Sequence, residues 1–517
     1  MASRLKRDRA RQRLAFLLSI SEDPDFLQMI WCVDRLRAGD FEVGARGLRN
    51  LPGDLRQKLA EHALYIQPWI LEDLVNELFT VDKPKVIVPR RLNCESYVGF
   101  ASAYTAALAV DDAESGFELE RGRDVLQAMP RFGHRQFDWQ QGWMSAPMLY
   151  RSAFIYGQGE CEAWFMNQHG LTPSELVLFA MASISVYSNT PYGKPENFLV
   201  PQLNLDGRII NAALALMSAP LKDVRDEAIR SRRGSLNVAA RPSVLRRTPM
   251  VNIGDRGIMA PLPELVLERA TAGLYLDLVK APSGMRDYIG RRFEQYSLEL
   301  FEAAFGDKAR GEYVYGSKSA PLKTPDILVG ETNQLKLIVE CKATRMSFAV
   351  RFSDDWHQET TRGYGELAKG VGQIWRHCSH MRRGLVPDRP STDLVGLLLT
   401  LDPWMRMTHK QDEVILELAR DWCANSDPEI TAEDECSISF THVGDIEALL
   451  HRTTSEGVLT VLGSAARKVG WGTNELGYEE KVEELGRPYF FKDRVSEVLP
   501  WYDRLGDGGA AGSLGSV

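Results

Sequence analysis

Apolar residues recur every three or four positions through most of the first half of the chain. This spacing is typical of helices with one buried face, and it is found at residues 7–20, 25–39, 55–64, 68–79, 137–157, 172–188 and 206–230. Thr172 and Glu175 form a capping box at the start of one of these segments. The pattern predicts a large, mainly helical N-terminal region.

The pattern changes after about residue 271. A long amphipathic helix is predicted at 285–306, and continuous apolar runs typical of buried strands follow at 327–329, 337–339, 393–403 and 437–443. A further short strand is predicted at 312–316, and helical spacing returns at 410–424. Strands that alternate with helices predict an α/β or α+β core with a mixed sheet flanked by helices.

Four regions follow from these patterns. We expect a helical domain at 1–130, an aromatic-rich helical domain at 131–270, a sheet-containing domain at 271–470, and a C-terminal extension with a flexible tail at 471–517. The segment 231–249 is basic and rich in Gly, Pro and Ser, and we expect it to be an exposed linker that ends the second domain.

Composition agrees with a globular protein of several domains. The chain has 517 residues, of which 44% are hydrophobic and 26% charged, and its formal net charge is −8. This balance argues against a surface covered in positive charge, but local fields still permit a nucleic-acid enzyme. Seven scattered cysteines without a CxxC pair indicate reduced thiols, and no segment is long enough to span a membrane, so we expect a cytoplasmic protein.

Charged residues end one of the apolar runs. Glu340 and Lys342 follow the run 337–339, and a strand places them on one face with Cys341 on the other. Asp326 opens the preceding run, and residues 330–334 can form a turn between the two strands. A hairpin would therefore bring Asp326 close to Glu340. Two clustered carboxylates repel each other unless a cation lies between them, and Mg²⁺ prefers such oxygen ligands.

The sequence Pro325-Asp326, a spacer, and Glu340-Cys341-Lys342 after an apolar strand resembles the signature of the PD-(D/E)xK nuclease superfamily. The resemblance covers roughly residues 285–445 and implies a restriction-endonuclease-like fold. It also implies that Glu294, on the helix before the first strand, completes the site, and that Gln373 is the polar residue on the helix after the second motif. His377 stands at the position where the exonuclease branch of this superfamily has a tyrosine, so the chain departs from the exonuclease pattern.

The implied activity is metal-dependent hydrolysis of phosphodiester bonds by an endonuclease. Asp326 and Glu340 would hold Mg²⁺, with Mn²⁺ able to substitute, and the Cys341 carbonyl and Glu294 would add ligands. Lys342 would position the attacking water, and Gln373 would support the site. DNA is the expected substrate, and a nuclease domain fused to an unfamiliar helical region suggests, by analogy, a bacterial restriction or anti-phage defence effector.

Two other patterns were weighed as competing sites. A second acidic-x-Lys triplet, Glu479 to Lys481, has no apolar strand before it and is interpreted as a solvated face. His377, Cys378 and His380 could suggest zinc, but no further ligands occur at matching spacing. The chain also lacks a GxxxxGK[ST] phosphate loop, which argues against an ATPase.

The basic segment supplies candidate nucleic-acid contacts, namely Arg232, Arg233, Arg246 and Arg247. The alternatives are an RNA-directed nuclease, or a nuclease-fold scaffold that binds nucleic acid or protein without cutting. The helical half is the expected surface for a homo-oligomer or a partner protein.

Overall fold

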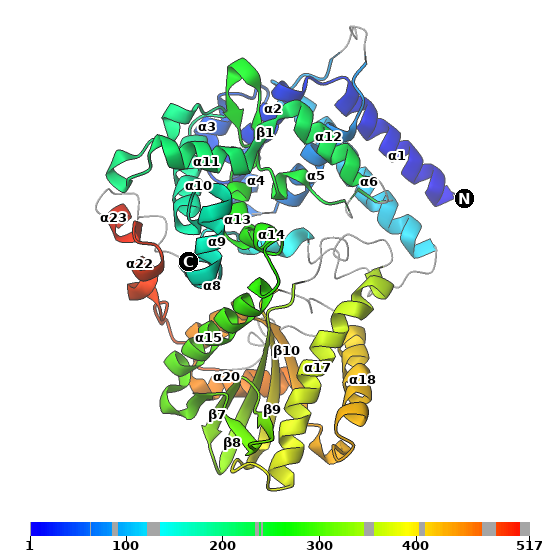
Figure 1. Cartoon of the computed structure of the whole chain (residues 1–517). Helices are drawn as coiled ribbons and strands as arrows, with labels where there is room; N and C mark the ends of the chain where they lie inside the picture. The colour runs from blue at the N-terminus through cyan, green and yellow to red at the C-terminus, as the bar shows by residue number, and fades with distance from the viewer. Residues whose placement is uncertain are drawn as a thin grey trace.

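The structure is a computed structural model that describes residues 2–62, 64–84, 91–120, 135–232, 237–238, 241–345, 356–402, 409–467 and 482–506. Figure 1 shows a helical part above and a sheet-containing part below. We call residues 2–278 the helical half and residues 285–467 the sheet domain. The predicted division between a helical N-terminal region and a mixed α/β region is confirmed.

Thirteen of the helices described lie in the helical half. They are α1 (Ala2–Ser19), α2 (Asp23–Arg37), α3 (Phe41–Ala45), α4 (Leu55–Glu61), α5 (Pro68–Thr80), α6 (Tyr97–Glu120), α8 (Ala146–Tyr156), α9 (Gly159–His169), α10 (Pro173–Tyr187), α11 (Gly207–Met217), α12 (Leu221–Arg232), α13 (Glu264–Ala270) and α14 (Tyr275–Leu278). The predicted capping box begins α10, where the Glu175 N–H donates to Thr172 Oγ1 at 3.1 Å and the Thr172 N–H donates to Glu175 Oε2 at 2.8 Å.

The continuous helix expected over 206–230 is interrupted. Ser218–Pro220 forms a strand, β1, which pairs in parallel with β2 (Met250–Asn252), and β2 pairs with β3 (Ile258–Met259). Pro220 has no N–H to donate and its ring clashes with a preceding helical turn, so a helix that ends before it is favoured.

The expectation of an exposed basic linker is wrong for residues 241–245. Val244 and Leu245 are buried in the core of the helical half, and the buried Arg241 pairs with Glu77 on α5. The ion pair neutralises the guanidinium, and the apolar side chains beside it anchor the segment. The positive charge of Arg241 is therefore matched by an acidic partner within the fold and does not indicate an exposed linker.

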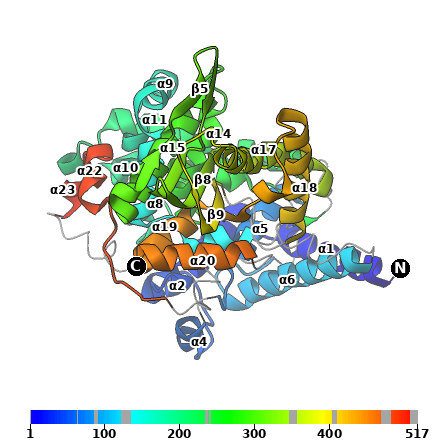
Figure 2. The same ribbon diagram turned by 90° about the horizontal axis from the view of Figure 1, so that it is seen from below.

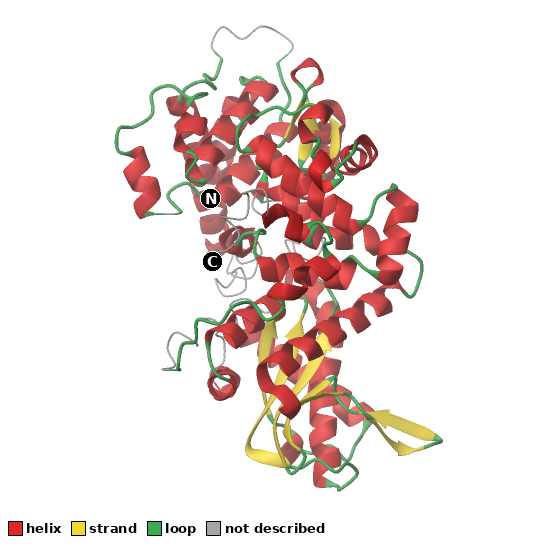
Figure 3. Ribbon diagram, turned by 90° about the vertical axis from the view of Figure 1, so that its left-hand side faces the viewer, coloured by secondary structure: helices red, strands yellow, loops and turns green. Residues whose placement is uncertain are grey.

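The sheet domain contains one five-stranded sheet in the order β10-β9-β8-β7-β4. Its elements are α15 (Met285–Phe305), β4 (Ala309–Gly311), β5 (Val314–Ser317), β6 (Ala320–Lys323), β7 (Ile327–Glu331), β8 (Gln334–Lys342), α17 (Trp356–Arg382), β9 (Pro390–Thr400), α18 (His409–Ser426), β10 (Ser437–His442), α19 (Val443–Arg452) and α20 (Ser455–Arg467). β4, β7 and β8 are antiparallel neighbours, whereas β8, β9 and β10 run parallel. The β5–β6 hairpin projects from the domain (Figure 3).

Helices cover both faces of this sheet. Leu328, Ile338 and Leu398 point toward α17 and α18 and form one core with them. Val329, Val339 and Leu397 point the other way, into a core with α15, α19 and α20 that continues into the helical half. Figure 2 shows this arrangement from below, with α17 and α18 together at one side. Strands buried on both faces explain the continuous apolar runs in the sequence.

The predicted hairpin of β7 and β8 is confirmed. Ile327 pairs with Val339 and Leu328 with Ile338, and the register shifts at Gly330. Gly330 has φ of 125°, and a Cβ there would lie 2.5 Å from the Gln334 carbonyl oxygen, so only glycine fits this bulge.

The C-terminal segment returns to the helical half. It contains α22 (Val495–Val498) and α23 (Tyr502–Gly506), and Trp501 Nε1 donates to the Ser174 carbonyl at 3.0 Å. No single helix of the described residues is long and apolar enough to cross a membrane; α9 and α10 pass by length and composition only as a pair, bent by 67°.

Candidate active site

The predicted acidic pair lies at the carboxyl end of β8. Asp326 directly precedes β7, and its neighbour Ile327 pairs with Val339, which places Asp326 beside Glu340 on the adjacent strand. Asp326 Oδ2 accepts a hydrogen bond from the Cys341 N–H at 2.7 Å. Because β8, β9 and β10 are parallel, their carboxyl ends share one edge of the sheet, which is where open α/β sheets usually bind ligands.

Lys342 connects Glu340 to the helix that covers this face of the sheet. Its Nζ donates to Glu340 Oε1 at 2.8 Å and to Gln373 Oε1, on α17, at 3.0 Å. Cys341 points to the opposite face and is buried in the core that includes α15. The alternation predicted from the strand pattern is confirmed, and Gln373 lies where the resemblance placed it.

Both carboxylates are costly to ionise in this surrounding. Glu340 is only 2% exposed, and its burial raises the pKa although the Lys342 ammonium partly offsets the effect. Burial, together with the nearby Glu340 carboxylate, raises the pKa of Asp326 well above its usual range. Burial opposes the charge of Lys342, but attraction to Glu340, the hydrogen bond to it and the charge of Asp326 together outweigh burial, so the pKa of Lys342 is raised. An additional cation beside the two carboxylates would relieve their repulsion.

Glu294 approaches the same group from α15. It is half-buried, and its pKa is raised by burial and by the negative charges of Glu312 and Glu340. Glu294 and Glu340 are therefore close enough to influence each other's ionisation. Its role as a ligand stays a prediction, as does that of the Cys341 carbonyl.

One observation speaks against a bound metal ion at this site, and two support it. Within the described residues, no three His, Cys, Asp or Glu side chains form a group that could hold a metal. The two carboxylates of Asp326 and Glu340 nevertheless match Mg²⁺, which is usually bound by one or two protein carboxylates, with water and substrate phosphate as the other ligands. Glu340 Oε2 is buried and has no hydrogen-bond partner among the described residues, so it is available to bind a cation.

Gly370 on α17 permits the close contact between this helix and the site. A Cβ at Gly370 would lie 2.6 Å from Leu398 Cδ1 and 2.7 Å from Lys342 Cε. We expect Gly370→Ala to displace Lys342, to destabilise the protein by about 1–3 kcal/mol, and to lower any activity by about 10²-fold. Thermal unfolding and a cleavage assay measure the two effects.

Gly365→Ala is the matched control for this prediction. Gly365 lies on the same helix, is exposed, and has no described atom within 4 Å of an added Cβ. The control should be neutral or slightly stabilising. Equal activities of the two variants would show that the position of Lys342 does not depend on Gly370.

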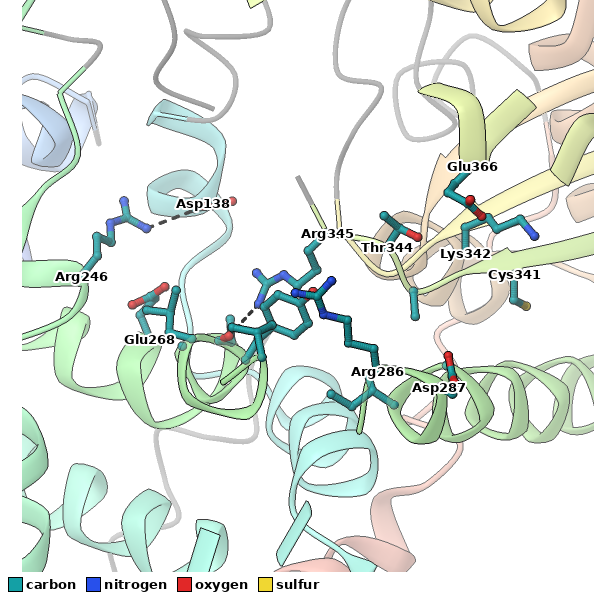
Figure 4. Close-up of a pocket in the computed structure, with 18 of the residues that line it drawn as sticks. Asp138, Arg246, Glu268, Arg286, Asp287, Cys341, Lys342, Thr344, Arg345 and Glu366 are labelled. Atoms are coloured by element: carbon teal, nitrogen blue, oxygen red, sulfur yellow. Dashed lines mark hydrogen bonds and ion pairs between the residues drawn. The ribbon is translucent and has the colours of Figure 1, made fainter. Parts of the chain in front are cut away.

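A cavity of about 990 Å³ opens beside the site, between the sheet domain and the helical half (Figure 4). The wall on the side of the sheet domain is lined by Lys342, Glu294 and Cys341. The wall on the side of the helical half carries charged pairs. In one of them, Arg246 Nε and Nη2 donate to Glu72 at 2.8 and 2.9 Å. The sequence gives no direct signal for this cavity because its walls come from segments about 270 residues apart.

Arg345 crosses from β8 toward the helical half. Its Nε donates to Asp402 Oδ1 and its Nη1 to the Ala272 carbonyl, both at 2.8 Å. Its guanidinium also lies 4.9 Å from the Tyr275 ring centre. These contacts fix the strand end against the cavity.

The arginines predicted to bind nucleic acid differ in their surroundings. Arg246 lines the cavity but is already paired with Glu72, and Arg232 Nη1 donates to Thr80 Oγ1 at 3.1 Å. Arg247 is exposed, whereas Arg233 lies outside the described residues. Their contact with nucleic acid stays a prediction.

The two competing patterns in the sequence were the group of His377, Cys378 and His380 and the triplet at Glu479 to Lys481. His377 Nε2 lies 3.6 Å from Asp388, His380 Nε2 lies 3.3 Å from Asp427, and Cys378 contacts Cys436. These side chains therefore have separate partners in the fold. The triplet at Glu479 to Lys481 lies outside the described residues.

Comparison with models of known protein families, with curated protein sequences and with solved structures finds no match to this chain.

Proposed function

We propose that the chain is a metal-dependent endonuclease that hydrolyses phosphodiester bonds, with DNA as its substrate. The observation that supports this most is the hydrogen-bonded group at the carboxyl end of β8. There, Lys342 joins Glu340 to Gln373, while Asp326 directly precedes the neighbouring strand β7 and accepts from the Cys341 N–H. Two carboxylates able to bind a metal ion, with a lysine beside them on one sheet edge, are groups that can carry out metal-assisted hydrolysis of a phosphodiester bond.

The order of the surrounding elements supports a restriction-endonuclease-like fold. α15 carries Glu294, the β7–β8 hairpin carries the acidic pair, and α17 carries Gln373 before a parallel strand follows. These are the positions that the resemblance implies for the site residues. The fold assignment is part of the proposal.

Each residue has a defined task in this proposal. Asp326 and Glu340 would bind Mg²⁺ or Mn²⁺, which supplies an activated water and stabilises charge on the phosphate. Lys342 orients the attacking water and offsets negative charge at the phosphate, and Gln373 holds the Lys342 ammonium in place through its 3.0 Å hydrogen bond. Glu294 faces the cavity, where it can accept a proton or a hydrogen bond from water.

The experiment is incubation of the full chain with plasmid DNA, single-stranded DNA and RNA, in Mg²⁺, Mn²⁺ or EDTA. We expect cleavage of DNA with either metal and none in EDTA. Cleavage of RNA alone would favour the RNA-directed alternative. Binding of nucleic acid without cleavage in any metal would favour the scaffold and refute the enzyme.

A cellular role follows from the proposal only by analogy. We propose a bacterial restriction or anti-phage defence effector in which the helical half binds a second copy or a partner protein. A plaque assay that compares cells with the chain and with its Glu340→Ala variant tests this role. Equal phage titres would contradict it.

A further inference from the structure

One face of α15 forms part of the cavity wall and extends the candidate site. Arg286, Gly290, Arg291 and Glu294 all line the cavity. Arg286, Gly290 and Glu294 are four residues apart, on successive turns of one helix face, and Arg291 borders that face. Figure 4 shows Arg286 pointing from α15 into the cavity, with Asp287 next to it on the same helix. The α15 face therefore runs from the cavity interior to the carboxylates.

Gly290 is unusual on this face. It lies inside a 21-residue helix, where glycine is a poor helix former, and no described atom lies within 4 Å of an added Cβ. The packing of the described residues thus gives no reason for a glycine there. A bare helix backbone is, however, suited to close approach by a ligand.

Positively charged groups without described carboxylate partners flank Gly290. Arg286 and Arg291 on α15, and Lys369 on α17, are exposed and form no ion pair with a described carboxylate. The arginines of the opposite wall differ, because Arg246 pairs with Glu72 and Arg135 with Asp73. Asp287 and Glu366 also line the cavity, so positive charge is confined to the positions of the arginines and lysine that flank Gly290. A ligand whose anionic groups are spaced apart suits this distribution of charge.

The size of the cavity limits what this ligand can be. Its volume of about 990 Å³ is that of a site for a small ligand or a few nucleotides. One turn of B-form duplex, about 34 Å long, occupies on the order of ten times that volume. The cavity can therefore enclose a short stretch of single strand but not a whole turn of duplex.

We propose that the face of α15 with Arg286, Gly290 and Arg291 binds the sugar-phosphate backbone of one unpaired nucleic-acid strand. Arg286, Arg291 and Lys369 contact its phosphates, and the bare backbone at Gly290 lets a sugar approach the helix beside Glu294. This inference rests on the proposed nuclease function, and it names the substrate as single-stranded or locally unpaired nucleic acid.

Fluorescence anisotropy in EDTA tests the proposal without cleavage. The probes are a labelled 30-nucleotide DNA strand, the RNA strand of the same sequence, and the blunt 30-base-pair duplex. We expect the full chain to bind a single strand at least about tenfold more tightly than the duplex. Comparison of the DNA and RNA strands identifies which of the two is preferred.

Two sets of variants locate the strand. Gly290→Leu should weaken single-strand binding about tenfold or more, while Gly116→Ala, in an equally open position on α6, should leave it unchanged. Gly290→Ala should keep or raise the thermal midpoint, which would show that the helix tolerates a side chain at this position. Weaker binding by Gly290→Leu would then not be caused by lost folding. Arg286→Ala/Arg291→Ala should reduce the slope of log K against log salt by about 1.4, unlike the exposed control Arg46→Ala/Lys308→Ala.

The failure of this inference differs from the failure of the proposed function. Duplex binding as tight as single-strand binding would overturn the inference and leave a nuclease acting on duplex. Normal strand binding by folded Gly290→Leu would also overturn it, because the strand would then not lie on this face of α15. Absence of cleavage of every nucleic acid in Mg²⁺ would instead refute the nuclease.

Discussion

Glu340→Gln is expected to lower DNA cleavage by at least about 10³-fold while the protein stays folded. Glu340 is buried, carries an oxygen without a hydrogen-bond partner among the described residues, and lies beside Asp326 and Lys342. The amide preserves the shape of the side chain but removes the negative charge that a metal ion needs. Rates measured at saturating Mg²⁺ on single-stranded DNA and on plasmid, with circular dichroism to check folding, test the expectation.

Two companion variants separate the roles in this group. Asp326→Asn should also abolish cleavage, and its thermal midpoint should be unchanged or higher, because the amide oxygen still accepts from Cys341 N–H while repulsion with Glu340 is removed. Lys342→Ala should lose about 10²–10³-fold in rate because the phosphate charge is no longer offset. A stabilised but inactive Asp326→Asn would mark the pair as functional rather than structural.

Matched controls lie on the same hairpin. Lys336 is exposed on β8 and Glu331 is exposed at the end of β7, so Lys336→Ala and Glu331→Gln should retain full activity. Cleavage by Glu340→Gln at a rate within tenfold of these controls would refute the assignment of the site.

The site could be predicted from the sequence where short-range geometry decides it. The turn between the two apolar runs is short, so the hairpin and the approach of Asp326 to Glu340 follow from strand periodicity alone. The direction of Cys341 into the opposite core follows from the same alternation. Gln373 came only from the resemblance, since nothing local in α17 marks it as a partner of Lys342.

Other features depend on contacts that are distant in sequence. The burial of residues 241–245 depends on the pairing of Arg241 with Glu77 on α5, 164 residues earlier, and composition alone made that segment resemble a linker. The cavity requires the helical half to lie against α15. Arg286, Gly290 and Glu294 follow one another at intervals of four residues, a signal that becomes meaningful only when the helix face is known to be open.

The second large effect is expected on stability, and it concerns the contact between the helical half and the sheet domain. Glu447 on α19 is 4% exposed and pairs with Arg151 on α8 of the helical half, and it also accepts from the Tyr296 hydroxyl on α15. Glu447→Ala would leave the Arg151 cation buried without its partner. We expect the free energy of unfolding to fall by about 3–5 kcal/mol.

The cost of the unpaired charge can be distinguished from simple loss of packing by a double variant without either charge. Glu447→Leu combined with Arg151→Met replaces both charges by apolar groups, and we expect it to restore most of the stability that Glu447→Ala loses, because the cost lies in the unpaired charge. Glu456→Ala, at an exposed position on α20, should change stability by less than about 0.5 kcal/mol. Denaturant unfolding measures all four proteins. A Glu447→Ala variant as stable as the Glu456→Ala control would show that the two halves are held together by the apolar core alone, and the cavity between them would then not depend on this ion pair.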